Sequence, residues 1–160
     1  MPIRDRWAAW MLERRYGAHG SAEKTLRSLT SVRDRVLDRA EVGDGDVVLD
    51  VGAGDGLIAF GALDRIGSNG RVVFSDVSND LLDIARRLAE EAGAGERATF
   101  VRARAEDLAP IENESVDVVT TRSVLIYVAE KRRAFKEFFR VLRPGGRVSI
   151  FEPINGFGSP

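Results

Sequence analysis

The segment Val47–Gly56 constrains the fold of this chain more than any other stretch of its sequence. It reads Val-Val-Leu-Asp-Val-Gly-Ala-Gly-Asp-Gly, an apolar strand followed by a turn with glycine at every second position. Because glycine has no side chain, such a turn lets the backbone approach a ligand closely. Leu57 then begins an apolar-periodic segment, so the turn precedes a helix. This order predicts a cofactor site at the carboxyl end of the first strand of an α/β sheet.

The spacing of the glycines separates this turn from the dinucleotide fingerprint. That fingerprint is Gly-x-Gly-x-x-Gly, whereas Gly52, Gly54 and Gly56 place the third glycine one residue early. Asp50 and Asp55 add carboxylates that would repel a pyrophosphate. The turn therefore favours a cationic or zwitterionic ligand over a nicotinamide dinucleotide. The alternative is a tight turn between strand and helix that binds no ligand.

The rest of the chain alternates between strand-like and helix-like segments. Strands are expected at 47–51, 71–76, 98–102, 116–121 and 146–151, and helices at 22–42, 57–66, 79–92 and 131–142. Ser78 or Asn79 is expected to cap the helix over 79–92. Such alternation implies right-handed crossovers and a Rossmann-like, doubly wound, mainly parallel α/β sheet with helices on both faces. We expect this core over residues 21–160, and an N-terminal helical lid or extension over residues 1–20.

Composition excludes several classes of site and partner. The 160 residues contain no Cys, which excludes disulfides, thiolate catalysis and cysteine zinc sites. The single histidine, His19, cannot build a metal site by itself, and no metal is expected. The formal net charge of -1 gives no support for binding nucleic acid or an anionic membrane. Without a membrane span or signal-peptide core, the chain is expected to be cytoplasmic, and its arginine bias is typical of a GC-rich bacterial gene.

Asp76 is the second informative residue of the chain. It ends the expected strand over 71–76, about twenty residues beyond the glycine turn, where a carboxylate can accept hydrogen bonds from both hydroxyls of a ribose. The alternative is an aspartate that caps the following helix. Together with the glycine turn, Asp76 favours a ligand that contains a ribose.

Four motifs in order give the chain a family resemblance. Val47–Gly56, Phe74–Ser78, Val116–Thr121 and Phe139–Arg147 resemble successive motifs of class I S-adenosylmethionine-dependent methyltransferases, over residues 22–153. The chain is most similar to the small-molecule type, typified by the ubiquinone/menaquinone C-methyltransferases. The resemblance implies an enzyme that transfers a methyl group from S-adenosylmethionine to a small-molecule acceptor and releases S-adenosylhomocysteine.

The resemblance also implies a cofactor site. Its residues would be Asp50, Gly52, Ala53, Gly54, Asp76, Val77, Ala105, Glu106 and Arg122. The first four would line the methionine part, with the Asp50 carboxylate near the α-ammonium. Asp76 would accept hydrogen bonds from the ribose hydroxyls, and Val77 would pack on the adenine face.

The segment Arg104–Asp107 departs from the family pattern. The family often reads Asp-Ala here, with its Asp accepting a hydrogen bond from the adenine amino group, and Arg104 occupies that Asp position. A guanidinium donates but cannot accept hydrogen bonds. The replacements that the sequence offers are Glu106, Asp107 or a backbone carbonyl.

The segment after strand 116–121 faces cofactor and substrate in this fold. Arg122 either binds an anionic group bidentately or is a solvated surface residue. Ser123 lies on the same segment, and Tyr127 either faces the substrate or packs against a helix. The residues expected in the core are Leu125, Ile126 and Val128.

Methyl transfer does not require a covalent enzyme intermediate. The protein contributes mainly proximity and orientation, and a general base is needed only when the acceptor must lose a proton. No catalytic residue is therefore assigned. Tyr16 and His19 are candidates to cap the cofactor pocket or lie in a surface loop, and Trp7 and Trp10 suggest a lid over the acceptor.

The chain departs from the family at its C-terminal end. The family sheet normally adds a strand hairpin beside strand five, whereas this sequence stops soon after residue 151, so we expect a truncated or minimal form without that hairpin. The exposed edge of strand five, or the N-terminal helix, would then be the contact of a homodimer. The alternative function is a non-catalytic module, with a methyltransferase-like fold, that binds S-adenosylmethionine or dimerises.

Overall fold

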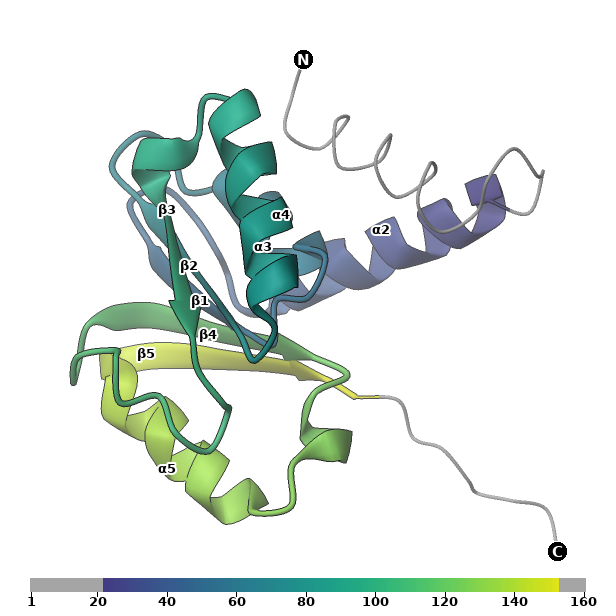
Figure 1. The fold of residues 1–160 in the computed structure, drawn as a ribbon. Coiled ribbons are helices and arrows are strands. Elements are labelled where there is room, and N and C mark those ends of the chain that lie inside the picture. Colours follow the sequence, from purple (N-terminus) through teal and green to yellow (C-terminus); the bar gives the residue numbers. More distant parts are fainter. Residues whose placement is uncertain (1–21, 153–160) are drawn as a thin grey trace, which may run out of the picture.

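Helices and strands alternate along most of the part of the chain that the computed structural model describes, residues 22–152, with side chains from residue 27 (Figure 1). The strands are β1 (Val47–Val51), β2 (Arg71–Asp76), β3 (Ala98–Arg102), β4 (Val116–Arg122) and β5 (Leu142–Phe151). The helices are α2 (Ala22–Arg39), α3 (Leu57–Leu63), α4 (Asn79–Glu91) and α5 (Lys131–Val141), with short 3-10 turns η2 (Gly95–Arg97) and η3 (Leu125–Tyr127). The predictions for residues 1–20, which concern the lid and Trp7, Trp10, Tyr16 and His19, lie outside the described residues.

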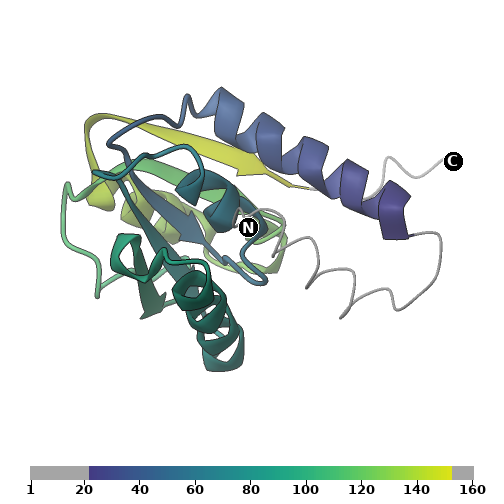
Figure 2. The same cartoon turned by 90° about the horizontal axis from the view of Figure 1, so that it is seen from above.

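The strands form one parallel sheet in the order β3-β2-β1-β4-β5. Helices α2, α3 and α4 cover one face, and α5 lies on the other (Figures 1 and 2). This arrangement confirms the doubly wound α/β fold with helices on both faces. Among the described residues, β5 forms one edge of the sheet and β3 the other.

Strand β1 lies at the centre of the sheet because its apolar side chains are buried on both faces. Val48 packs into the hydrophobic cluster under α2, α3 and α4, whereas Leu49 packs into the cluster under α5. Asp50 is the exception, a carboxylate only 2% exposed within this strand. Continuous β-branched runs of this kind are typical of central parallel strands, and the bounds of β1 agree with the expected 47–51.

Several element boundaries differ from or refine the prediction, and helix α2 ends at Arg39, before the expected residue 42. Helix α3 ends at Leu63 and does not continue to residue 66, although Ile66 is fully buried. Ile66 continues the apolar pattern through the turn that follows the helix, so periodicity alone overestimates the helix length. The N-cap of α4 is Ser78, whose Oγ accepts a hydrogen bond from the Leu81 N–H at 3.3 Å.

Strand β5 begins at Leu142, earlier than the expected residue 146. Leu142 pairs with Val116, and the register then shifts so that Arg147 pairs with Val118. The residues between them bulge around Gly145, whose φ of 81° is in the left-handed region. The predicted turn at 144–146 is therefore a bulge inside a longer strand, because backbone pairing resumes on both sides of it.

The sheet order reverses between β1 and β4. From β1 the chain proceeds through α3 to β2 and through α4 to β3, and residues 103–115 then return it across the sheet to β4. In open α/β sheets, ligands bind outside the carboxyl ends of the strands at such a switch point. The fold therefore places the residues that follow β1 and β4 at the expected position of a ligand site.

Candidate functional site

A cavity of about 510 Å³ opens at the carboxyl ends of β1, β2, β3 and β4. All nine residues for which the sequence implies cofactor binding line it. The complete lining is Asp50–Asp55, Leu57, Ile58, Asp76, Val77, Ala103–Glu106, Arg122–Val124, Tyr127 and Val128. The fold thus brings together segments more than seventy residues apart in the sequence.

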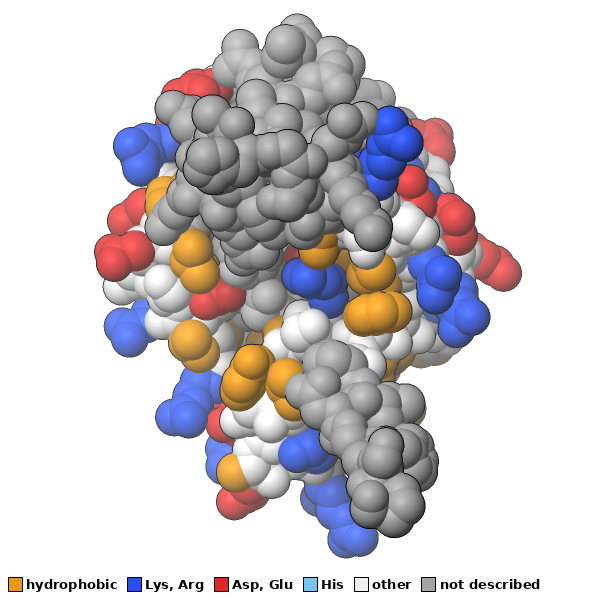
Figure 3. All heavy atoms as spheres, turned by 90° about the vertical axis from the view of Figure 1, so that its right-hand side faces the viewer, with side chains coloured by type: hydrophobic (Ala, Val, Ile, Leu, Met, Phe, Trp, Pro, Cys, Tyr) orange, Lys and Arg blue, Asp and Glu red, His pale blue; other side chains and the backbone are white. Residues whose placement is uncertain are grey.

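The surface on this side of the molecule carries no uniform charge. Figure 3 faces the side toward which β5 runs in Figure 1, and its described hydrophobic side chains lie beside both basic and acidic ones. The cavity itself is lined by four carboxylate side chains and two guanidinium side chains, from Asp50, Asp55, Asp76, Glu106, Arg104 and Arg122. Such a mixture suits a ligand that carries charges of both signs.

The three glycines of the turn are required for different structural reasons. Gly52, Gly54 and Gly56 have φ values of 69°, 54° and 84°, in the left-handed region that other residues rarely adopt. A Cβ at Gly52 would collide with the Val124 side chain, and one at Gly56 would collide with the Phe60 ring. A Cβ at Gly54 would meet only the Gly52 carbonyl oxygen, at 3.9 Å, which is an ordinary van der Waals contact. The protein's own packing therefore explains two of the glycines, and backbone conformation alone explains Gly54.

Hydrogen bonds to the Asp76 carboxylate connect the glycine turn to the end of β2. Its Oδ2 accepts a hydrogen bond from the Gly54 N–H at 2.8 Å, and its Oδ1 accepts one from the Ser78 N–H at 2.9 Å. A carboxylate has about four acceptor positions, so both oxygens can accept further hydrogen bonds. Asp76 lines the cavity but does not cap α4, because Ser78 fills that role.

Asp50 is a buried carboxylate with an elevated pKa. Burial raises the pKa of Asp50 from 3.8 to about 7, and repulsion from the Asp76 carboxylate adds to this effect. A hydrogen bond from the Thr120 Oγ1, 2.7 Å from Asp50 Oδ1, and the positive charge of Arg122 act in the opposite direction. Because a cation favours the ionised form of a nearby carboxylate, this position suits a positively charged ligand group.

The segment after β4 forms the opposite wall of the cavity. Arg122 is half-buried there, and its side chain makes no hydrogen bond or ion pair with another described residue. Tyr127 is 82% exposed and lines the cavity, which argues against the alternative that it packs against a helix. Leu125 and Val128 are buried as expected, but Ile126 is 40% exposed because η3 turns it outward, which contradicts its expected core position.

The turn over residues 104–107 forms a third wall. The exposed Arg104 side chain places its Nε 3.3 Å from Glu106 Oε1, and both residues line the cavity. Asp107 is exposed and lies outside the cavity lining, so it is not placed to replace the family's Asp. Glu106 and the backbone of the turn are the remaining candidates.

Sequence analysis missed one residue that shapes the site. Glu152, directly after β5, accepts hydrogen bonds from the backbone N–H groups of Val124 and Leu125 at 2.9 Å each, and of Ile126 at 3.3 Å. Its carboxylate therefore satisfies the free N–H groups at the start of η3. The available signal was its position, because the carboxyl ends of parallel strands meet at one edge of the sheet.

Two further classes of feature are absent from residues 22–152. That part of the chain contains no cluster of three or more His, Cys, Asp or Glu side chains that could hold a metal ion. None of its helices is long and apolar enough to cross a membrane.

Known proteins share this sequence pattern and this fold. The model of the methyltransferase domain family matches residues 48–146. The ubiquinone/menaquinone biosynthesis C-methyltransferase UbiE of Vibrio vulnificus is 32% identical over 116 residues, 72% of this chain and 44% of that protein.

Solved structures of other proteins show the same fold. The [4+2]-cyclase SpnF superposes with a TM-score of 0.70 at 29% identity, over 77% of this chain and 44% of its own. A geranyl diphosphate methyltransferase in complex with GPP and sinefungin gives a TM-score of 0.69 at 27% identity, over 76% of this chain and 43% of its own. The chain therefore spans less than half the length of these proteins.

Proposed function

The chain belongs to the methyltransferase domain family, and from this premise we propose that it binds S-adenosylmethionine and transfers the methyl group to a small-molecule acceptor. One observation carries the proposal: the nine residues implied by the family motifs line a single cavity at the switch point of the sheet. Relatives that are C-methyltransferases support it.

The nucleoside part of the cofactor is assigned to the β2 and β3 side of the cavity. Both oxygens of Asp76 retain acceptor capacity for the ribose hydroxyls. Val77 is an apolar side chain, 59% exposed, at the cavity wall, which suits packing against the adenine face. Ala105 and Glu106 would bound the adenine edge, with the Glu106 carboxylate as the acceptor that Arg104 cannot supply.

The methionine part is assigned to the β1 and β4 side. The Asp50 carboxylate would attract the α-ammonium, and the unpaired Arg122 guanidinium would bind the α-carboxylate. The backbone of Gly52, Ala53 and Gly54 would lie against the chain between them. The two side chains thus match the two charges of a zwitterionic amino acid.

Within this site, the protein would act mainly by orientation. The methyl group passes from the sulfonium to the acceptor by in-line displacement, so holding both molecules in register provides most of the acceleration. Tyr127, exposed at the cavity wall, is the described side chain best placed to contact an acceptor. No described residue is assigned as a general base.

The acceptor is proposed only as a small molecule. The relatives named above include a methyltransferase of quinone biosynthesis, a methyltransferase bound to geranyl diphosphate and a cyclase. The cyclase illustrates that this fold supports more than one chemistry. The assignment to methyl transfer therefore depends on the family match and on the charges in the cavity.

We extend the proposal to location and partners as follows. The protein acts in the cytoplasm, with residues 21–160 as the cofactor-binding core and residues 1–20 as its helical lid or extension. It binds neither nucleic acid nor membrane, in keeping with a net charge of -1. A homodimer would form through the β5 edge or the N-terminal helix.

Transfer of a labelled methyl group tests the proposed activity. The 160-residue chain is incubated with methyl-labelled S-adenosylmethionine and panels of small-molecule acceptors, with Asp76→Ala as the control that lacks the ribose acceptor. We expect label in an acceptor with the unmodified chain and little with the variant. Binding without transfer to any acceptor or cell extract would support the non-catalytic alternative. Competition by NAD at this site would contradict the cofactor assignment.

A further inference from the structure

The connection between β3 and β4 lacks a helix of its own. Residues 103–115 cross the face of the sheet as an irregular segment with several turns, and Leu108 and Ile111 pack into the hydrophobic cluster under α5. The first part of this connection supplies the cavity wall over residues 103–106. A long irregular connection has many backbone polar groups that need partners, so its contacts decide how firmly it is held.

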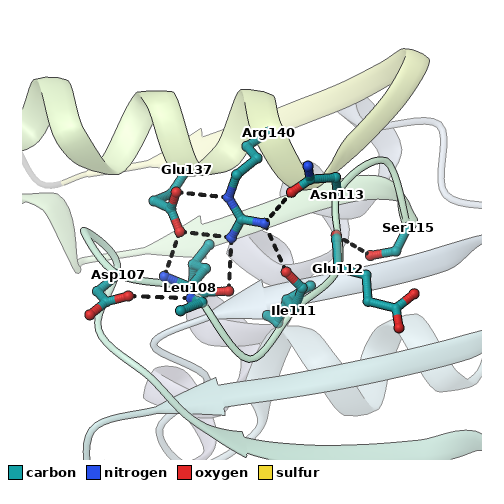
Figure 4. A network of polar contacts seen from close by, with 9 residues as sticks. Asp107, Leu108, Ile111, Glu112, Asn113, Ser115, Glu137 and Arg140 are labelled. Carbon is teal, nitrogen blue, oxygen red and sulfur yellow. Dashed lines mark hydrogen bonds and ion pairs between the residues drawn. The ribbon is translucent and has the colours of Figure 1, made fainter.

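A pair of charged side chains on α5 provides many of these contacts (Figure 4). The Arg140 guanidinium donates hydrogen bonds to the Leu108 and Ile111 carbonyl oxygens at 2.9 Å each, and to Asn113 Oδ1 at 2.7 Å. The Glu137 Oε2 accepts a hydrogen bond from the Leu108 N–H at 2.7 Å. Both backbone polar groups of Leu108 are therefore bound to this pair.

Glu137 and Arg140 also hold each other's side chains in place. Two parallel hydrogen bonds of 2.8 Å join Arg140 Nε to Glu137 Oε1 and Arg140 Nη2 to Glu137 Oε2. This bidentate geometry orients both side chains toward the connection. The hydrogen bonds from Arg140 lower the pKa of the Glu137 carboxyl, with a further contribution from the Leu108 N–H, so it remains ionised near neutral pH.

The turn over residues 104–107, which forms one wall of the cavity, is held by hydrogen bonds on both sides. At its start, the Ala103 N–H donates to the Asp76 carbonyl oxygen at 3.1 Å, which ties it to the end of β2. The Asp107 N–H donates to the Arg104 carbonyl oxygen at 3.0 Å, which closes the turn. Leu108 follows at once and is held by the α5 pair. The position of the turn over residues 104–107 therefore depends on α5.

We propose that Glu137 and Arg140 are positioning residues of the cofactor site, which set its affinity for the adenosine part of the ligand without touching it. Neither side chain lines the cavity. Their effect passes through Leu108 to the wall formed by Ala105 and Glu106. This inference rests on the proposed function, because it concerns the same site.

Calorimetric titration of the 160-residue chain with S-adenosylhomocysteine tests the inference. The variants are Arg140→Lys, which cannot reach all four partners at once, and Glu137→Gln, which removes the charge with little change in shape. The matched controls are Arg86→Lys and Asp83→Asn, because these residues form an i,i+3 ion pair on α4 that does not contact the connection. We expect Kd to rise about tenfold in both α5 variants and to remain unchanged in both controls.

Stoichiometry and a shortened ligand separate positioning from loss of folded protein. Partial unfolding would lower the number of sites per chain, whereas positioning raises Kd at an unchanged number of sites. Kd for 5′-methylthioadenosine, which lacks the amino acid part, should rise by the same factor. Unchanged Kd values in both α5 variants would overturn the inference and leave the proposed function intact. No binding by the unmodified chain would overturn both.

Discussion

Replacement of Asp50 by asparagine should make the protein more stable at high pH while weakening its ligand site. Asp50 is buried at 2% exposure and interacts with the Ala59 backbone N–H, and its Oδ1 accepts a hydrogen bond from the Thr120 Oγ1. Asparagine has nearly the same shape and retains an oxygen that can accept this hydrogen bond. The variant therefore removes the charge and leaves the packing largely unchanged.

The magnitude follows from the pKa of the Asp50 carboxyl, which burial raises from 3.8 to about 7. Below about pH 4 the carboxyl is protonated in both the folded and the unfolded chain, so it has no effect on stability. Between about pH 4 and pH 7 the unfolded chain releases the proton and the folded chain keeps it, so the free energy of unfolding falls as the pH rises. Above pH 7 the full destabilisation of about 4 kcal/mol is present.

Urea denaturation of both proteins at pH 4.5, 6 and 8 measures this effect. The difference between variant and unmodified chain cancels the titration of the other groups, which are common to both proteins. We expect the Asn variant to be more stable by about 4 kcal/mol at pH 8 and by less than about 1.5 kcal/mol at pH 4.5. A difference that is independent of pH, or that favours the unmodified chain as the pH rises, would refute the reasoning.

Other positions give further expected outcomes. Gly52→Ala combines a left-handed φ with a clash against Val124, so it should lower the free energy of unfolding by about 3 kcal/mol. The control Gly54→Ala has the left-handed φ without the clash and should lower it by about 1 kcal/mol. Urea denaturation measures both values. Asp76→Asn should weaken S-adenosylhomocysteine binding about tenfold or more, as measured by calorimetry. The reason is that one carboxylate oxygen becomes an NH₂ donor that faces the backbone N–H of Gly54 or Ser78. An unchanged Kd would exclude a role for this carboxylate in ligand binding. Glu152→Gln should cost about 1–2 kcal/mol and speed hydrogen exchange at Val124 and Leu125, and equal exchange rates would argue against the cap.

The central strands could be predicted because their side-chain pattern alone determines them. The bounds of β1 and β2 agree with the expected ranges, since buried parallel strands appear as continuous apolar runs. Those of β3, an edge strand without a fully buried side chain, agree as well. The apolar pattern gives wrong element bounds in two situations. A buried side chain can lie beyond the end of a helix, and backbone pairing of a strand can begin before its apolar run. Ile66 is buried but lies beyond the end of α3, and Leu142 pairs with Val116 before a bulge that resembles a simple turn in the sequence.

The cavity lining could be predicted in part because the carboxyl ends of parallel strands meet at one edge. That rule places Asp50, Asp76 and Arg122 together without any knowledge of distances. The supporting contacts could not be predicted in this way. Glu137 and Glu152 bind backbone N–H groups 26 to 29 residues away along the chain, and such partners depend on the fold and not on local residue type.

A crystal structure of the chain with S-adenosylhomocysteine would test the central claim most directly. We predict that the ligand fills the cavity at the carboxyl ends of β1, β2, β3 and β4, with its ribose hydroxyls on the Asp76 carboxylate, its ammonium beside Asp50 and its carboxylate on Arg122. A ligand bound elsewhere, or bound in this cavity with its ribose away from Asp76, would contradict the assignment of the site.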